Sequence, residues 1–136
     1  YLCIVRGTPK PAEGKLEGYL FKDAKENRVY ITKQPQAGAK TAVTFYRTLE
    51  SKDGLSLVEC ELLTGRTHQI RAQMADAGWP LLGDGKYGSR DNRAKSPALR
   101  AVRLTVKLPG GEIKSVFSPP DFSQYPWSEF DGSAVL

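Results

Sequence analysis

Two alternating segments joined by a short polar turn place the strongest constraint on the fold of this chain. Apolar and polar residues alternate along residues 41–50 and again along 55–63. Such alternation is typical of strands that bury one face. The connection between them contains Asp53-Gly54, the dipeptide most typical of a tight hairpin turn. We therefore expect these two segments to form a β-hairpin.

The pattern changes to helical spacing directly after this hairpin. Ile70 and Met74 are four residues apart, which places them on one face of a helix. Thr64 or Thr67 can cap the start of that helix. Gly78, followed by Trp-Pro, is a standard signal for its end.

The remaining segments complete an α+β pattern. Further strands are expected at 1–6, 15–21 and 28–33, and a second hairpin at 98–108 and 111–118. A long basic loop (81–97) precedes that hairpin, and a tail rich in proline and aromatic residues follows it and is expected to lie over the surface. Several strands with one main helix predict a single α+β domain with a mixed, largely antiparallel sheet.

Composition excludes several classes of protein. The 136 residues suit one domain with an ordinary soluble composition. No apolar run approaches the roughly 20 residues that span a bilayer, so we expect no membrane contact. Cys3 and Cys60 each lie in an alternating segment. Two buried free thiols in a reducing compartment, which favours a cytoplasmic location, are a better explanation than a disulfide framework.

The net charge of +5 is unevenly distributed. Residues 66–107 contain nine Lys/Arg and three Asp, a net charge of +6, and the other residues together carry −1. A basic stretch of this kind is expected of a face that binds a polyanion. A solvated basic surface with no partner is the alternative.

Few residues suggest chemistry by their pattern alone. His68 is the only histidine, so a metal site is not expected, and a hydrolase centred on it has no supporting nucleophile motif. We favour a structural hydrogen bond at the helix start. The segment GDGKYG (83–88) lacks the P-loop pattern and is better explained as a tight turn. Arg66 and Arg71 flank the helix start and can bind phosphate or a carboxylate, or form surface salt bridges.

The segment ELLTGRTHQIRAQMADAGWPLLGDGKYG (61–88) closely resembles the signature segment of RNA pseudouridine synthases of the RluA type. The segments on either side follow that family's order, and YLCIVRG resembles the family's strand that begins at an active-site tyrosine. The resemblance covers residues 1–122. It implies an enzyme that isomerises uridine to pseudouridine in structured ribosomal or transfer RNA, as a monomer, with neither cofactor nor metal.

The resemblance also implies roles for individual residues. Tyr1 matches the tyrosine that packs against the flipped base, Arg71 the residue that pairs with the catalytic aspartate, and Leu99 an apolar residue of the base pocket. RNA-binding positions are implied at Arg66, Thr67, His68 and Gln69. An aromatic face suits an unstacked base, and a paired arginine keeps an aspartate ionised. The chain departs from the family's usual residues at Ala72, Gln73, Trp79 and Arg100.

One element of the family pattern is absent from the sequence. The family's nucleophilic aspartate lies in an HRLD-type motif upstream of the strand that starts at Tyr1, and no such motif occurs among the 136 residues. Asp76 and Asp84 do not match it. We therefore expect residues 1–136 to be the C-terminal part of one catalytic domain and to be inactive alone. A non-catalytic RNA-binding or assembly module on the same scaffold is the alternative.

Overall fold

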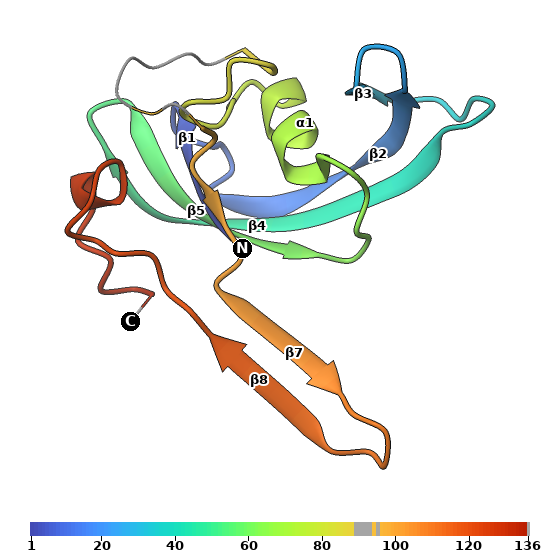
Figure 1. Ribbon diagram of the computed structural model, residues 1–136. Helices are drawn as coiled ribbons and strands as arrows, with labels where there is room; N and C mark the ends of the chain where they lie inside the picture. The colour runs from blue at the N-terminus through green and yellow to red at the C-terminus, as the bar shows by residue number, and fades with distance from the viewer. Residues whose placement is uncertain (89–93, 95, 136) are drawn as a thin grey trace.

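A six-stranded antiparallel sheet with one helix on it forms the body of the molecule (Figure 1). The structure is a computed structural model that describes residues 1–88, 94 and 96–135. The strand order is β3-β2-β4-β5-β1-β6. The strands are β1 (Leu2–Arg6), β2 (Glu13–Asp23), β3 (Arg28–Thr32), β4 (Lys40–Lys52), β5 (Leu55–Leu62) and β6 (Leu99–Arg100).

The expected central hairpin is confirmed. β4 pairs with β5 in antiparallel register around the turn at 53–54, with one irregularity between Thr48 and Glu50. β5 then pairs with β1, and β4 with β2. Every strand ladder among the described residues is antiparallel. The α+β class is therefore confirmed, and the sheet is more uniformly antiparallel than the expected mixed sheet.

Helix α1 (Gln69–Asp76) lies on one face of the sheet (Figure 1). Its C-terminus is as predicted. Gly78 has a φ of +96°, and the N–H groups of Gly78 and Trp79 bond the carbonyls of Ala75 and Met74, which is a Schellman motif. The predicted threonine cap is wrong, because His68 occupies the N-cap position in a left-handed conformation with no side-chain cap bond.

The two faces of β1 belong to different apolar clusters. Cys3 and Val5 pack with Met74 of α1, whereas Leu2 and Ile4 pack on the opposite face with the C-terminal tail. The tail residues in this second cluster are Phe122, Tyr125, Trp127, Phe130 and Val135. The tail, which includes the short 3-10 helix η1 (Trp127–Glu129), therefore covers the second face of the sheet. Both cysteines are buried and free, as expected.

The second predicted hairpin is also present, as a separate two-stranded arm. β7 (Arg103–Lys107) pairs with β8 (Ile113–Phe117), and the arm projects away from the main sheet (Figure 1). Every residue of both strands is exposed. The predicted basic loop continues through residues 89–93 and 95, which lie outside the described residues. No described helix is long and apolar enough to cross a membrane.

Gly83 offers a test of how tightly the loop after α1 is packed. Its φ is +81°, and a Cβ atom there would lie 2.4 Å from the carbonyl oxygen of Ser96 and 2.9 Å from that of Ala94. We expect Gly83→Ala to lower the free energy of unfolding well beyond the roughly 1 kcal/mol cost of the backbone conformation alone. Urea denaturation measures this effect.

Gly78→Ala is the matched control, because its φ is +96° and a Cβ atom added there would have no described neighbour within 4 Å. It reports the conformational cost without a steric clash. Equal losses of stability in the two variants would contradict the close packing of the loop.

Candidate functional site

A buried network of polar side chains fixes the start of α1 to the sheet. Gln69 and Gln73, one turn apart, are 2% and 3% exposed, and Thr44 of β4 lies between them. The Thr44 hydroxyl accepts a bond from Gln69 Nε2 (2.9 Å) and donates one to Gln73 Oε1 (2.6 Å). Because a buried polar group without a partner destabilises the fold, this network holds the helix in one position.

The Thr64 hydroxyl donates to Gln69 Oε1, and the remaining amide bonds of both glutamines reach the backbone. Gln69 Nε2 donates to the carbonyl of Val43, and its Oε1 accepts the N–H of Arg66. Gln73 Nε2 donates to the carbonyls of Leu16 and Ala42. The helix start and strands β2 and β4 are therefore joined through side chains as well as by apolar packing.

Arg71 lies just beyond this network and is held by Asp84. Its Nε and Nη2 donate to the two carboxylate oxygens at 2.8 Å and 3.0 Å. The Asp84 side chain is fully buried, and that of Arg71 is 20% exposed. The carboxylate raises the pKa of Arg71 above its ordinary value, through this hydrogen bond more than through charge alone. Arg71 is therefore a fixed cation at the edge of the core.

This pairing leaves part of the guanidinium free. A guanidinium has five N–H groups, and two of them serve Asp84. No described residue accepts a hydrogen bond from Nη1. Arg71 can therefore bind a second anion without releasing Asp84. The pairing of Arg71 with an aspartate outside this sequence stays a prediction.

Tyr87 links Arg71 to the helix start. Its ring lies 5.2 Å from the Arg71 Cζ and 4.9 Å from the Arg28 Cζ. Its hydroxyl accepts the N–H of Val29 and lies 3.0 Å from His68 Nδ1. The direction of this bond depends on the tautomer of His68. In the neutral tautomer whose Nδ1 accepts the Tyr87 proton, Nε2–H is the donor available to a ligand.

The surroundings of His68 favour its neutral form. Partial burial, and then the positive charges of Arg71 and Lys86, lower the pKa of His68, while Asp84 acts in the opposite direction. The expected structural hydrogen bond of His68 is present, to Tyr87. Among the described residues, no group of three His, Cys, Asp or Glu side chains is arranged to hold a metal ion.

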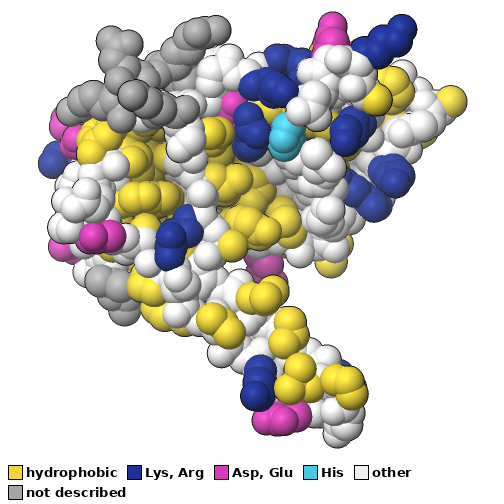
Figure 2. Space-filling view, in the orientation of Figure 1, with side chains coloured by type: hydrophobic (Ala, Val, Ile, Leu, Met, Phe, Trp, Pro, Cys, Tyr) yellow, Lys and Arg dark blue, Asp and Glu magenta, His cyan; other side chains and the backbone are white. Residues whose placement is uncertain are grey.

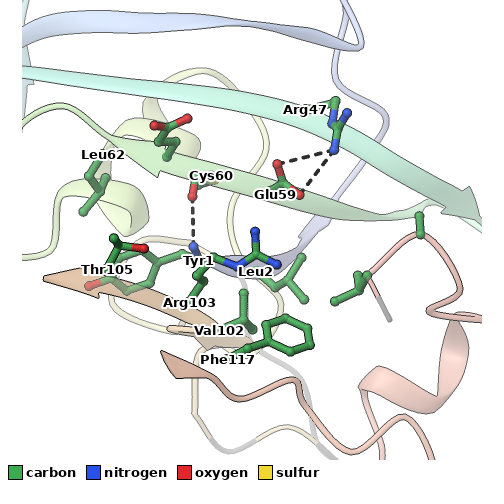
Figure 3. A pocket seen from close by; sticks show the side chains of 13 residues that line it. Tyr1, Leu2, Arg47, Glu59, Cys60, Leu62, Val102, Arg103, Thr105 and Phe117 are labelled. Atoms are coloured by element: carbon green, nitrogen blue, oxygen red, sulfur yellow. Dashed lines mark hydrogen bonds and ion pairs between the residues drawn. The ribbon is translucent and has the colours of Figure 1, made fainter. Parts of the chain in front are cut away.

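Tyr1 lies at the edge of a groove beside the start of β1. Its side chain is 41% exposed. The groove has a volume of about 700 Å³ and lies between the start of β1, the end of β5 and the β7–β8 arm (Figure 3). Arg103 and Phe117 of the arm also line it. An exposed aromatic ring beside a basic side chain in such a groove can stack on a nucleobase.

Apolar residues connect this groove with the helix. Leu62 lines the groove and also packs against the cluster that contains Ile70, the neighbour of Arg71. Leu99 is partly buried against the same cluster and pairs with Cys3 in register. Leu62 and Leu99 thus pack against the cluster that contains Ile70, whereas Tyr1 lines the groove and Arg71 does not.

The residues predicted to bind RNA separate into two groups. Thr67 is exposed and His68 and Arg66 are partly exposed, with Arg66 Nε bonded to the carbonyl of Thr41. Gln69 is buried, and its amide is committed to the polar network. In this structure Gln69 positions the helix, and its contact with RNA stays a prediction.

Two of the sequence departures have local explanations. Gln73 belongs to the buried network with Thr44, so its amide supports helix packing. Trp79 packs against Tyr46 with ring centroids 5.5 Å apart. The structure offers no reason for the departure at Arg100 beyond its bonds to Ser118.

Sequence reasoning missed the group formed by Asp84, Tyr87 and Arg28. The pattern of GDGKYG predicts only a turn, yet Asp84 and Tyr87 are among the buried residues of this region. Arg28 is about forty positions from α1 in the sequence, and only the fold brings it to Tyr87. A buried aspartate thirteen residues after an arginine has no periodic signal that would reveal the pair.

Comparisons with known proteins agree on one family. The family profile described as RNA pseudouridylate synthase matches residues 1–76. Dual-specificity RNA pseudouridine synthase RluA of Escherichia coli (strain K12) is 35% identical over 130 residues, covering 90% of this chain and 57% of that protein. RNA pseudouridine synthase 2, chloroplastic, of Oryza sativa subsp. japonica is 39% identical, covering 91% of this chain and 35% of that protein.

A solved structure supports the same relationship. Human RNA Pseudouridylate Synthase Domain Containing 1 superposes with a TM-score of 0.76 at 28% identity, covering 89% of this chain and 54% of that one. Uncharacterized RNA pseudouridine synthase YlyB of Bacillus subtilis (strain 168) is 40% identical over 66% of this chain. The chain spans between 29% and 57% of the length of these relatives.

The Arg71–Asp84 pair can be tested by a double-mutant cycle. Arg71→Ala leaves the buried Asp84 carboxylate without its partner, so we expect the free energy of unfolding to fall by about 3–5 kcal/mol. Arg71→Ala/Asp84→Ala removes both charges and is expected to be more stable than Arg71→Ala alone. Urea denaturation of the four proteins measures the coupling, and simple additivity of the two single losses would contradict it.

His68 is expected to make stability depend on pH in one direction. Its folded-state pKa is lowered, so the unfolded chain takes up the proton first as the pH falls below about 6.5. The contribution of neutral His68 to the free energy of unfolding is present above that pH, and it is lost as the pH falls toward the pKa of His68 in the folded state. Asparagine tolerates the left-handed conformation of residue 68. In urea denaturation, His68→Asn should therefore lose less free energy of unfolding than the wild type between about pH 7 and 5. An unchanged pH dependence would contradict this assignment.

Proposed function

Because the chain belongs to the RluA-type family of RNA pseudouridine synthases, we propose that it forms part of a catalytic domain that isomerises uridine to pseudouridine in ribosomal or transfer RNA. The observation that carries the proposal is the fixed guanidinium of Arg71. It is oriented by Asp84, keeps free N–H groups and lies over the ring of Tyr87.

Arg71 is proposed to position the nucleophile of the reaction. A catalytic aspartate must stay ionised in a partly buried site, and an adjacent guanidinium lowers its pKa. Asp84 cannot be that nucleophile in this conformation, since its side chain is fully buried and both of its oxygens bind Arg71. We propose that Asp84 orients Arg71, and that the nucleophile belongs to an HRLD-type segment absent from these 136 residues.

Tyr1 and Leu99 are proposed to hold the target base. A uridine within folded RNA must leave its stack before its glycosidic bond can be broken. The exposed ring of Tyr1 at the groove offers a stacking surface, which is worth roughly 1–3 kcal/mol per base. The apolar cluster at Leu99 would exclude water beside the base. Arg66, Thr67 and His68 are proposed to contact the neighbouring RNA.

A non-catalytic RNA-binding or assembly module on the same scaffold is the second candidate, and the basic charge of residues 66–107 suits RNA binding in either case. The two candidates differ in one measurable reaction. Isomerisation replaces the C5–H bond of uridine by the new glycosidic bond, so RNA labelled with tritium at C5 loses its label to water. A binding module retains RNA and releases no label in any form of the protein.

We expect the 136-residue chain alone to release no tritium from RNA containing 5-tritiated uridine, because it lacks the nucleophile. A longer protein that joins this sequence to an HRLD-type segment is expected to release it. In that longer protein, Arg71→Lys keeps a positive charge near Asp84 but loses the fixed fork of donors. We expect kcat to fall about 100-fold or more with RNA affinity largely retained.

Asp76→Asn, on the exposed end of α1, is the control and should leave tritium release unchanged. Release by the short chain would show that it contains its own nucleophile. An Arg71→Lys enzyme with unchanged kcat would remove Arg71 from the proposed role.

A further inference from the structure

A second cluster of basic side chains lies beside the start of α1, at the turn between β2 and β3. Arg28 Nη1 donates to the carbonyl of Lys86, and Lys86 Nζ donates to the carbonyl of Asn27 at 2.6 Å. These two bonds join the β2–β3 turn to the loop that contains Asp84. In the ion pairs formed between described residues, neither Arg28 nor Lys86 meets a carboxylate. Their charges are therefore not neutralised by a close partner in this part of the chain.

Arg28 is held in a defined orientation. Its Cζ lies 4.9 Å from the ring centre of Tyr87 and 5.7 Å from that of Tyr30. Arginine stacked on aromatic rings loses little further entropy when it binds, because its planar fork is already ordered. Such a fork matches the geometry of phosphate oxygens.

The acidic residues of the turn are engaged locally. Asp23 accepts the N–H groups of Lys25 and Glu26, and the Glu26 carboxylate accepts the Tyr30 hydroxyl. These bonds serve the turn and its tyrosine. Neither carboxylate forms an ion pair with Arg28 or Lys86 among the described residues.

The electrostatic field at His68 reports the same excess of positive charge. Partial burial lowers the pKa of His68 most, and the charges of Arg71, Lys86 and Lys22 lower it further, while that of Asp84 raises it. Figure 2 shows Lys and Arg side chains gathered around the single histidine on this face. The distribution of charge along the sequence assigns the excess to residues 66–107. The fold adds Arg28, which lies over the Tyr87 ring, and Lys22, which pairs in register with Val29, the residue whose N–H bonds the Tyr87 hydroxyl.

We propose that Lys22, Arg28 and Lys86, with the Nε2–H of His68, form a phosphate-binding surface for the RNA backbone that flanks the target uridine. Phosphate contacts position a nucleic acid without reading its sequence. The surface lies on the same side of α1 as Arg71, which also contacts Tyr87. It would therefore hold the strand next to the reacting nucleotide. This inference rests on the proposed function, because it takes RNA as the substrate.

The test is fluorescence anisotropy of the 136-residue chain with a fluorescein-labelled RNA stem–loop at two salt concentrations. Each phosphate contact contributes about one unit to the slope of log affinity against log salt. For each lost contact, the ratio of affinities between about 50 and 200 mM salt should thus shrink about three- to fourfold. We expect this change for Lys22→Gln and a larger one for Arg28→Gln/Lys86→Gln. Arg28→Lys should retain most of the salt dependence.

Lys15→Gln is the matched control, since Lys15 is also an exposed cation on β2 but pairs with Glu17. It should leave the salt dependence unchanged. Lys22 is exposed, so its variant tests the surface even if Arg28→Gln/Lys86→Gln unfolds, which circular dichroism would reveal. The inference would be overturned if Lys22→Gln bound RNA with the salt dependence of the wild type, or if Lys15→Gln reduced that dependence equally. Either result would leave the proposed function unaffected. Failure of the wild-type chain to bind RNA would instead count against the proposed function.

Discussion

The buried carboxylate of Asp84 is the interaction on which the candidate site depends. A charge with no exposure to solvent is tolerated only when it is paired and hydrogen-bonded. Its oxygens bind Arg71, and one also accepts the N–H of Tyr87. Asp84 therefore fixes both the guanidinium and the loop that carries the tyrosine. Gly83 makes this geometry possible, because any side chain there would collide with the backbone at Ser96.

Two independent restraints then meet at the start of α1. The polar network of Gln69, Thr44 and Gln73 attaches the helix to the sheet, and the Arg71–Asp84 pair attaches it to the following loop. Each restraint is buried and satisfied, so displacement of the helix would expose several unpaired groups at once. Rigid support of this kind keeps a functional side chain in place to a fraction of an ångström. It explains how a segment of only eight residues can hold the Arg71 guanidinium in one position.

The sequence is a good guide wherever a local pattern decides the structure. Alternation predicts the strands, Asp53-Gly54 predicts the hairpin, and Gly78 predicts the helix end. The predicted cap is wrong because Thr64 bonds Gln69 Oε1 instead of a free helix N–H group. The burial of Gln69 could not be predicted, because the position of a residue in a motif says nothing about its exposure. The contribution of Arg28 could not be predicted, since it depends on which strands lie beside which helix.

The two arginines that contact Tyr87 show why proximity alone does not define a role. Arg71 is neutralised by Asp84, so its charge stabilises the fold and only its free N–H groups remain for a ligand. Arg28 donates to a neutral carbonyl, which orients it without cancelling its charge. The first therefore suits a carboxylate that must be held at one point, and the second suits the diffuse negative charge of an RNA backbone. One aromatic ring thus lies between the cation proposed to position the nucleophile and the cation proposed to attract the RNA backbone.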